Sequence, residues 1–383
     1  MLRRILRGVA FGGGLAGLAY LAVARRCVAD FKARGRERSD EQPSVTIFKP
    51  LYGEEPDLAE NLSSFCQQDY ADFRVIFGVA DVDDPALAVA ERVRASFPSR
   101  DIVVAVGGAQ TAGNPKVANL LNMARDARGE IYVIADSDMR VDGKYLPTLV
   151  APFADPRIGA VTCLYRARAA NGLASALGAM YINAYFAPSA LVAAAFQDVG
   201  FALGATIAVR RSILEEAGGF AALIPHLADD YALGQLTRAS GHDIHLSRYI
   251  VENFVTEPSL NALLQHELRW ARTIAAVQPA GYALSGITFP FTLALLYLLL
   301  GGNRRRGMTL AAAALAARAA LQKVAYETLG VSKNDPLWLI PVRDALAFGI
   351  WFASFFGRRV TWRERTLIQD RRGHLTGKEP AAC

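Results

Sequence analysis

Acidic side chains follow two strand-like apolar runs, where they are suited to bind a charged ligand. The run 130–136 ends in a D-S-D triplet whose acidic members are Asp136 and Asp138, and the run 73–80 ends just before Asp81. Two carboxylates two residues apart can hold Mg²⁺ or Mn²⁺ and leave positions for phosphate oxygens. Such an ion can neutralise a departing diphosphate. The same triplet is also typical of solvated turns and helix caps, so the pattern alone leaves both interpretations open.

A further acidic residue and a basic–aromatic pair lie downstream. Asp230 precedes a helical stretch, where the alternative interpretation is a first-turn acid beside a helix cap. The predicted helix 259–275 carries His266, Arg269 and Trp270. Arg269 offers a planar donor fork that suits phosphate, and Trp270 offers a large apolar face. Taken alone, these three residues are also typical of a packed amphipathic helix.

Missing motifs exclude several classes of enzyme. The sequence has no G-x-x-x-x-G-K-[ST] phosphate loop, and no G-x-G-x-x-G fingerprint follows the first strand-like run. P-loop chemistry and nicotinamide chemistry are therefore not expected. The four cysteines have no paired spacing, which argues against a disulfide framework and against a cysteine-built zinc site.

The elements that must position these residues alternate along the chain. Short, β-branched apolar runs are separated by stretches with helical spacing, which predicts an α/β domain with a mainly parallel sheet covered on both faces. Ligands of such sheets bind at the carboxyl ends of the strands. We expect strands at 45–48, 73–80, 101–106, 130–136 and 158–164, and helices at 57–67, 85–98, 115–128 and 143–153.

The charge distribution argues against a nucleic-acid partner. The net charge is +6, but residues 1–38 carry +7 and residues 357–383 carry +4, so the body between them carries −5. A nucleic-acid binder would carry its positive charge on the folded body. Basic ends beside apolar runs instead fit the charge bias of membrane proteins and attraction to anionic lipids.

The first apolar run, 5–24, is long enough to cross a bilayer. A cleaved secretory signal is the alternative, but the run is longer than a usual signal core and a basic segment follows it. Three basic residues lie before the run or at its start and six follow it, so the positive-inside rule places residues 25 onward in the cytoplasm. We expect an anchor at 1–26, a catalytic domain at 43–279, membrane segments at 282–356 and a basic tail at 357–383.

Three more apolar stretches lie at 282–302, 308–321 and 337–356, and the last two contain Arg318 and the adjacent pair Arg343-Asp344. Charges at such depth usually face a protein interior or a polar cavity. Three full crossings would put both Arg304–Arg306 and the basic tail outside. We favour a re-entrant or interfacial 282–302, which returns both clusters to the cytoplasm. The apolar stretch 171–196 is expected to be either a core helix or part of an acceptor entry surface.

Several short motifs occur in a fixed order along the chain: Lys49-Pro50-Leu51, Asp81, Gly113-Asn114-Pro115-Lys116, Asp136-Ser137-Asp138, Asp230-Tyr231, His266-Glu267-Leu268-Arg269-Trp270, Arg343-Asp344 and an Arg-Arg-x-x-Trp tail motif. Taken in order, these motifs resemble glycosyltransferase family 21, the ceramide glucosyltransferase family, from about residue 40 to Trp362. The resemblance implies a nucleotide-sugar-binding (GT-A) fold, and the surroundings of Arg269 look most like the bacterial hopanoid-biosynthesis-associated branch.

The resemblance implies an inverting transfer from a UDP-sugar to a lipid hydroxyl by a single displacement. Asp230 would be the base, and Mg²⁺ or Mn²⁺ at Asp136 and Asp138 would stabilise the leaving UDP together with Arg269 and Trp270. His266 stands where the family has Gln or Arg, and Asp138 stands where the animal relatives have Gly. The candidates for gripping the nucleotide are Lys49, Pro50, Asp81, Asn114, Lys116 and Asp136.

The resemblance also implies partners and a location. We expect a UDP-sugar donor, a lipid acceptor in the bilayer, and a multi-pass protein of the bacterial inner membrane whose catalytic domain faces the cytoplasm. The branch favours a hopanoid polyol and N-acetylglucosamine, while ceramide and glucose stay open. A processive polysaccharide synthase, a soluble-substrate transferase and a non-catalytic membrane scaffold are the competing interpretations.

Overall fold

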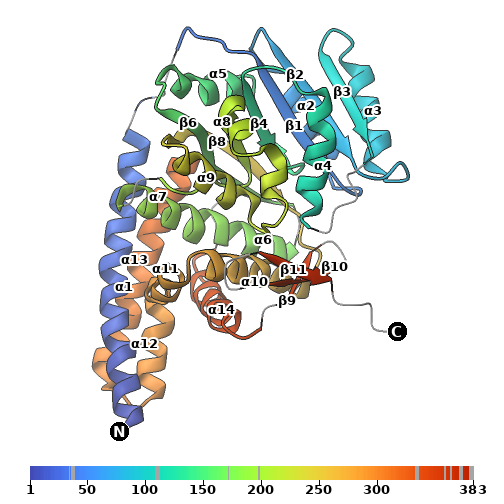
Figure 1. Cartoon of the computed structure of the whole chain (residues 1–383). Helices are drawn as coiled ribbons and strands as arrows, with labels where there is room; N and C mark the ends of the chain where they lie inside the picture. Colours follow the sequence, from blue (N-terminus) through green and yellow to red (C-terminus); the bar gives the residue numbers. More distant parts are fainter. Residues whose placement is uncertain are drawn as a thin grey trace. The chain divides into compact units, whose positions relative to one another are not determined.

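The computed structural model describes residues 1–33, 35, 39–107, 113–170, 172–196, 199–332, 336–357, 359–362, 365–370 and 374–378. The chain divides into two compact units, each built from separated segments (Figure 1). The helical unit comprises residues 1–34, 166–196 and 255–372, and the sheet unit comprises 35–165, 197–254 and 373–383. Some arginines counted in the basic segments after the first apolar run and in the tail lie outside the described residues: Arg34, Arg36, Arg38, Arg358 and Arg363.

The sheet unit contains an eight-stranded sheet in the order β3-β2-β1-β4-β7-β6-β8-β5. The strands β1 to β4 pair in parallel, whereas β7 runs antiparallel to β4 and to β6. Their bounds are β1 Val45–Leu51, β2 Phe73–Val79, β3 Asp101–Val106, β4 Ile131–Ala135, β5 Met139–Arg140, β6 Ile158–Ala169, β7 Thr206–Arg210 and β8 Asp243–Val255.

The expected α/β domain is confirmed, but the sheet is mixed rather than mainly parallel. Thr206 at the start of β7 lies opposite Ala135 at the end of β4. The chain therefore re-enters the sheet at the carboxyl end of β4 and must run in the opposite direction. This reversal brings the segment before β7 to the edge where Asp136 lies.

Helices cover both faces of the sheet because side chains of a strand alternate between its faces. In β1, Ile47 packs into one core cluster with α2 (Leu58–Cys66), α3 (Ala86–Ser96) and α5 (Tyr145–Val150). The next residue, Phe48, packs into the opposite cluster with α4 (Pro115–Met123), α8 (Arg211–Glu216) and α9 (Asp229–Ala239). Full burial of such a side chain contributes about 1.5–3 kcal/mol. Short helical turns complete the layers at η1 Ala124–Asp126, η2 Ala151–Ala154 and η4 Gly219–Leu223.

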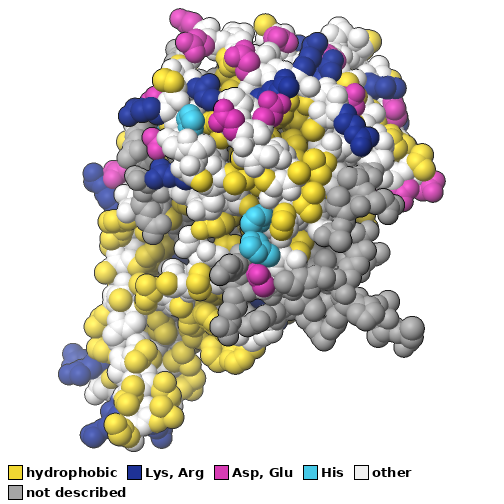
Figure 2. Space-filling model, in the orientation of Figure 1, with side chains coloured by type: hydrophobic (Ala, Val, Ile, Leu, Met, Phe, Trp, Pro, Cys, Tyr) yellow, Lys and Arg dark blue, Asp and Glu magenta, His cyan; other side chains and the backbone are white. Residues whose placement is uncertain are grey.

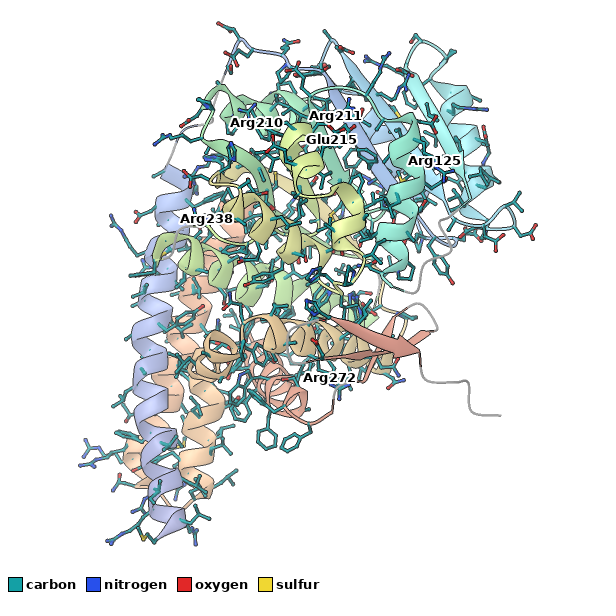
Figure 3. All side chains as sticks on the ribbon, viewed as in Figure 1. Arg125, Arg210, Arg211, Glu215, Arg238 and Arg272 are labelled. Atoms are coloured by element: carbon teal, nitrogen blue, oxygen red, sulfur yellow. The ribbon has the colours of Figure 1, made fainter. Side chains whose placement is uncertain are left out.

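Two arginines labelled in Figure 3 tie the sheet unit together away from the candidate site. Arg210 at the end of β7 donates to the carbonyl of Ile158 at 2.9 Å and to that of Phe153 at 2.6 Å. Arg238 near the end of α9 pairs with Asp243 at the start of β8, with 2.9 Å between Nη1 and Oδ1. These contacts fix one end of β7 and one end of α9. The opposite ends of both elements lie at the candidate active site.

The helical unit holds the apolar segments. Its elements are α1 Leu2–Ala33, α6 Gly172–Tyr181, the π-helix η3 Ile182–Phe186, α7 Ala187–Phe196, α10 Leu260–Val277, α11 Pro279–Leu284, η5 Ser285–Thr288, α12 Pro290–Leu299, α13 Arg304–Leu329, α14 Leu339–Ser354, and the antiparallel strands β9 Arg359–Trp362 and β10 Arg365–Gln369. The strand β11, Leu375–Lys378, belongs to the sheet unit.

Two helical stretches, α1 and 172–196, are long and apolar enough to cross a membrane, as judged by length and composition. The segments 279–288 and 290–299 together form a third candidate, which is bent by 73° and is either a broken span or a re-entrant loop. Figure 2 shows hydrophobic side chains over the lower part of the helical unit, with Lys and Arg side chains at its end. The protein is therefore suited to associate with a membrane.

The basic cluster Arg304–Arg306 lies at the N-terminal end of α1. Arg3 Nε donates to the carbonyl of Leu300 at 3.1 Å, and Arg7 Nη1 donates to that of Gly301 at 3.0 Å. At the other end of α1, the Nζ of Lys32 lies 3.9 Å from an oxygen of Glu327. The helix α13 thus runs parallel to α1, and α12 returns the chain to the start of α1.

This arrangement corrects the expectation that a re-entrant 282–302 returns Arg304–Arg306 to the side of residue 25. The bend after Thr288 directs α12 along α1 toward its N-terminus, so the cluster adds three charges to those of Arg3, Arg4 and Arg7. The basic residues at the two ends of α1 then balance, and the charge bias no longer sets the orientation of α1.

A reporter experiment tests this topology. If α1 crosses the membrane, reporters fused after residue 40 and after residue 305 of the full chain are expected to lie on opposite sides. Phosphatase and fluorescent-protein fusions at each position measure this directly, because each reporter is active on one side only. Fusions at 40 and 305 that report the same side would contradict the path of α12.

Candidate active site

The G-N-P-K motif docks the start of α4 against the segment that leads into α9. Asn114 is fully buried and caps α4, since its Oδ1 accepts from the backbone N–H of Lys116 at 2.9 Å. Its Nδ2 donates to the carbonyl of His226 at 2.9 Å and to Oδ1 of Asp229 at 3.2 Å. A Cβ on Gly113 would meet the side chain of Ile224 at 2.5 Å, so only glycine permits this approach. The motif therefore fixes where Lys116 points.

Lys116 joins the two acidic groups that the sequence places almost a hundred residues apart. Its Nζ lies 2.8 Å from Oδ1 of Asp136 and 3.4 Å from Oδ2 of Asp229. Burial alone would lower the pKa of Lys116, but the charges of Asp136 and Asp229 together raise it above its ordinary value. Lys116 is therefore a fixed positive charge at the carboxyl end of β4.

The base predicted from the sequence, Asp230, belongs to the same cluster. It lies in the first turn of α9, and its Oδ1 accepts from the N–H of Tyr231 at 2.8 Å. Burial, followed by the charge of Asp229, raises the pKa of Asp230 to about 6, although Lys116 opposes this. A Cβ on Gly204 would lie 3.1 Å from Oδ2 of Asp230, which leaves this carboxylate little room for a larger neighbour.

Asp138 is the more enclosed carboxylate of the D-S-D triplet. Its Oδ2 accepts from Nδ2 of Asn253 on β8 at 2.8 Å. Burial, followed by the charges of Asp136 and Glu55, raises the pKa of Asp138 to about 7. The charge of Asp136 also contributes to the raised pKa of Asp230. The three acidic residues predicted from the sequence therefore meet at one electrostatically connected site.

The pair Asp136 and Asp138 fits a divalent cation that completes its coordination shell with substrate oxygens. Both offer hard carboxylate oxygens, and a bound cation would relieve the repulsion that raises the pKa of Asp138. Within the described parts of the chain, no group of three or more His, Cys, Asp or Glu side chains is arranged to hold a metal ion. Two carboxylates fill only part of the coordination shell of such a cation, so other positions would be open to oxygens of a ligand.

Lys49 lies beneath this site rather than at its surface. Its side chain is fully buried in β1, donates to the backbone carbonyl of Asp136 and lies 3.9 Å from the ring centre of Phe65. Burial lowers the pKa of Lys49 to about 7, although Asp138 and Asp136 oppose this. In this position Lys49 orients the turn that carries Asp136. Its neighbour Pro50 is likewise buried within β1.

Asp81 lies at the exposed edge of the sheet after β2, where its Oδ1 accepts from the N–H of Asp83 at 3.1 Å. The nearby Asp84 holds the loop after β1, because its carboxylate accepts from the N–H of Gly53 at 2.9 Å and 3.1 Å. Gly53 has a φ of 72°, which favours glycine at this turn. The Asp81 side chain is therefore presented on a fixed loop, accessible to a ligand.

The remaining predicted residues, His266, Arg269 and Trp270, lie on α10 of the helical unit. Nδ1 of His266 lies 2.5 Å from Oε1 of Glu257, and its ring contacts that of Trp270 edge-on at 4.3 Å between centres. Arg269 is half-buried. The three positions share one side of the helix, since they are spaced by three and four residues.

Three residues of the site were not predicted as functional from the sequence. Asp229 binds both Lys116 and Asn114, Asn253 binds Asp138, and Glu55 contributes to the raised pKa of Asp138. For Asp229 the sequence offered one signal, its place in an Asp-Asp pair, because a nearby cation can offset the repulsion between neighbouring carboxylates. Asn253 and Glu55 carry no local signal, because only the folded sheet brings them near the triplet.

The fold defines the class of protein. The structure is similar to that of Mannosyltransferase PcManGT from Pyrobaculum calidifontis in complex with GDP-Man and Mn²⁺, with a TM-score of 0.55 and 19% identity. The match covers 92% of this chain and 99% of that one. The fold is that of the GT-A glycosyltransferases.

The chain belongs to glycosyltransferase family 21, whose model matches residues 9–374. It is 26% identical over 239 residues to Ceramide glucosyltransferase 3 of Caenorhabditis elegans, covering 62% of this chain and 52% of that protein. It is 25% identical over 239 residues to Ceramide glucosyltransferase 1 of the same organism, covering 62% of this chain and 51% of the relative. The match thus spans about half the length of these curated relatives.

Proposed function

We propose that the protein transfers a hexose, N-acetylglucosamine or glucose, from a UDP-sugar to a hydroxyl group of a membrane lipid, with inversion. The observation that carries this proposal is the cluster of Asp136, Asp229 and Asp230 around Lys116 at the carboxyl end of β4. In a glycosyltransferase fold, this edge of the sheet is where a nucleotide binds. The cluster offers a fixed cation and a carboxylate whose pKa suits proton transfer.

The donor would bind at the edge formed by Asp81, Lys116 and the D-S-D triplet. Asp81 is accessible for hydrogen bonds from the uracil or the ribose, and Lys116 is positioned to attract a diphosphate. The complex of PcManGT with GDP-Man and Mn²⁺ supports a sugar nucleotide and a divalent cation as ligands. Asp136 and Asp138 would hold that cation, which supplies positive charge to a leaving diphosphate.

The reaction needs one base and no carboxylate nucleophile. The lipid oxygen attacks the anomeric carbon while the bond to UDP breaks, and its proton passes to Asp230. A base is most effective when its pKa lies near the working pH, and a pKa of about 6 meets this condition. Arg269, with Trp270 beside it, is assigned to the charge that develops on UDP. His266, held by Glu257, would orient Trp270.

The acceptor is assigned to the membrane. The two membrane-length helices, α1 and the apolar stretch 172–196, support a lipid substrate. The catalytic side would face the cytoplasm of a bacterial inner membrane. The resemblance to the hopanoid-associated branch favours a hopanoid polyol. Ceramide is the second candidate, because the curated relatives are ceramide glucosyltransferases.

Lipid mass spectrometry of a strain that lacks this gene tests the proposal. Loss of a glycolipid is expected, and the mass of the lost head group distinguishes a hexose from an N-acetylhexosamine. The remaining lipid identifies the acceptor as a hopanoid or a ceramide. Unchanged glycolipids, with UDP release by the purified full chain only in the presence of a growing polysaccharide, would instead support a processive synthase.

The pH dependence of transfer tests the pairing of Asp229 with Asp230. The base must be deprotonated, so the rate is expected to fall as the pH drops through about 6. In Asp229→Asn the repulsion that raises the pKa of Asp230 is lost, so this acidic limb should move to lower pH. Asp243→Asn, which removes an exposed charge beside the far end of α9, is the matched control. An acidic limb that stays in place in Asp229→Asn would contradict the electrostatic coupling.

A further inference from the structure

Three helices of the helical unit meet at one buried arginine. Arg343 of α14 is fully buried, and its guanidinium binds both carboxylate oxygens of Glu267 on α10, at 2.9 Å and 2.5 Å. Its Nη1 also lies 3.4 Å from the carbonyl of Leu177 on α6, and its guanidinium carbon lies 4.9 Å from the ring centre of Tyr181. Glu267 is only 5% exposed. The pair is therefore a bidentate ion pair removed from water.

Such a pair is poorly explained by stability alone. Taking two charges out of water costs several kcal/mol for each ion, and an apolar pair of similar volume often stabilises a protein as well or better. What a bidentate arginine–carboxylate pair supplies is geometry, because two parallel hydrogen bonds fix distance and rotation together. The pair thus holds α10 in one rotation about its own axis.

The rotation of α10 matters because Arg269 follows Glu267 by two residues, about 200° around the helix, so the two side chains project from nearly opposite faces. Leu263, Glu267 and Ala271 form the buried face of α10, whereas Arg269 and Trp270 are half-buried. A second tie to the end of α14 lies one turn further along α10, where Arg272 (labelled in Figure 3) donates to the carbonyl of Phe356 at 2.9 Å. Arg343 in α14 and Phe356 just after that helix therefore hold α10 at two points. Together these contacts determine the direction in which the Arg269 side chain projects.

We propose that Arg343 and Glu267 are positioning residues that fix the rotation of α10 and thereby the orientation of Arg269 and Trp270, the residues assigned to the charge on the leaving diphosphate. This inference rests on the proposed transfer reaction, in which Arg269 stabilises UDP. It also gives a role to the charge of Arg343, which lies within an otherwise apolar stretch. Neither Arg343 nor Glu267 is required to touch the substrate.

The chain provides a matched control in a second buried ion pair. Arg318 of α13 and Asp344 of α14 are 3% and 1% exposed, with 3.7 Å between Nη2 and Oδ1. Asp344 also accepts from the N–H and the hydroxyl of Thr292 on α12, at 3.0 Å and 2.8 Å. This pair also joins an arginine to a carboxylate of α14, but its hydrogen bonds go to Thr292 of α12, Thr288 of η5 and Ala184 of η3 rather than to α10.

The experiment separates positioning from stability by neutralising both members of each pair. The single variant Glu267→Gln leaves Arg343 buried without its counter-charge and should lower the melting temperature. The double variant Glu267→Gln/Arg343→Met removes both charges and should recover most of that loss. Its kcat for UDP release onto extracted membrane lipid should nevertheless stay on the order of 10- to 100-fold below wild type, with KM for the UDP-sugar unchanged. Arg318→Met/Asp344→Asn should keep the wild-type kcat.

The outcomes distinguish the inference from the proposed function. A wild-type chain that releases no UDP from UDP-N-acetylglucosamine or UDP-glucose in the presence of that lipid extract would refute the transfer reaction itself. If the wild type is active and the Glu267→Gln/Arg343→Met variant recovers kcat together with its melting temperature, the pair serves stability only and the inference fails. An equal loss of kcat in Arg318→Met/Asp344→Asn would also overturn it.

Discussion

Replacing Asp230 with asparagine should reduce sugar transfer by about 10²- to 10⁴-fold, the usual contribution of a general base. The amide keeps the size of the side chain and can still accept the hydrogen bond from the N–H of Tyr231, so the start of α9 is preserved. It cannot take a proton from the lipid hydroxyl. Binding of the UDP-sugar should survive, because Lys116 and the D-S-D triplet are unchanged.

Transfer rates and calorimetric UDP-sugar binding, measured on the same preparation, test this prediction. Asp243→Asn removes an exposed carboxylate near the other end of α9 and should leave both quantities unchanged. Near-normal turnover in Asp230→Asn would mean that another group is the base. Loss of donor binding together with transfer would instead assign Asp230 to the nucleotide.

Replacing Asp136 with alanine should abolish metal-dependent binding of UDP. Asp136 contacts Lys116 and also contributes to the raised pKa values of Asp138 and Asp230, so its loss removes a ligand and misplaces the cation beside it. Because the site offers two carboxylates, Mn²⁺ and UDP should each bind weakly alone and tightly together. Removal of the metal by a chelator should weaken UDP binding in the wild type and have no further effect in Asp136→Ala.

Calorimetric titrations of UDP with and without Mn²⁺ measure this cooperation. Asp126→Asn, a change of an exposed acid in the same unit, serves as the control and should bind UDP as the wild type does. Unchanged UDP affinity in Asp136→Ala would overturn the assignment of the triplet. Tight Mn²⁺ binding without UDP would mean that the protein supplies more ligands than the two carboxylates.

The sequence predicted the fold and the acidic residues because both depend on local patterns. Apolar strands alternate with helical spacing, and polar residues that end parallel strands must meet at one edge, which is how Asp136, Asp138 and Asp81 were found. Asp230, which lies in the first turn of a helix, was assigned as the base through the family resemblance. The reversal of β7 was not predicted, because strand direction depends on where the chain re-enters the sheet. Asn253 could not be predicted either, since its partner Asp138 lies 115 residues away.

Lys49 and Arg304–Arg306 illustrate a second limit of prediction from the sequence, which is that the surroundings of a residue depend on the folded chain. A lysine near a predicted site suggests contact with a ligand, but burial depends on packing around β1 that no short motif reveals. The position of Arg304–Arg306 depends on a bend of 73° between two helical segments. The roles assigned to Arg269, Trp270 and His266 stay predictions, because they rest on the family pattern and on their shared side of α10.

Each of the two units is built from separated segments of the chain, and this connectivity affects whether proteolysis could release the protein from a membrane. The chain leaves the sheet unit at residue 166 for the helical unit, returns to it at 197 and leaves it again at 255. Proteolytic removal of α1 or α13 would leave α6, α7 and α10 covalently attached to the sheet unit. These helices would then lack a packing partner of the helical unit. Such a fragment would expose apolar surface and aggregate. Because the apolar helices are inserted within the sheet unit's sequence, proteolysis at a terminus cannot release a soluble, active form of the enzyme.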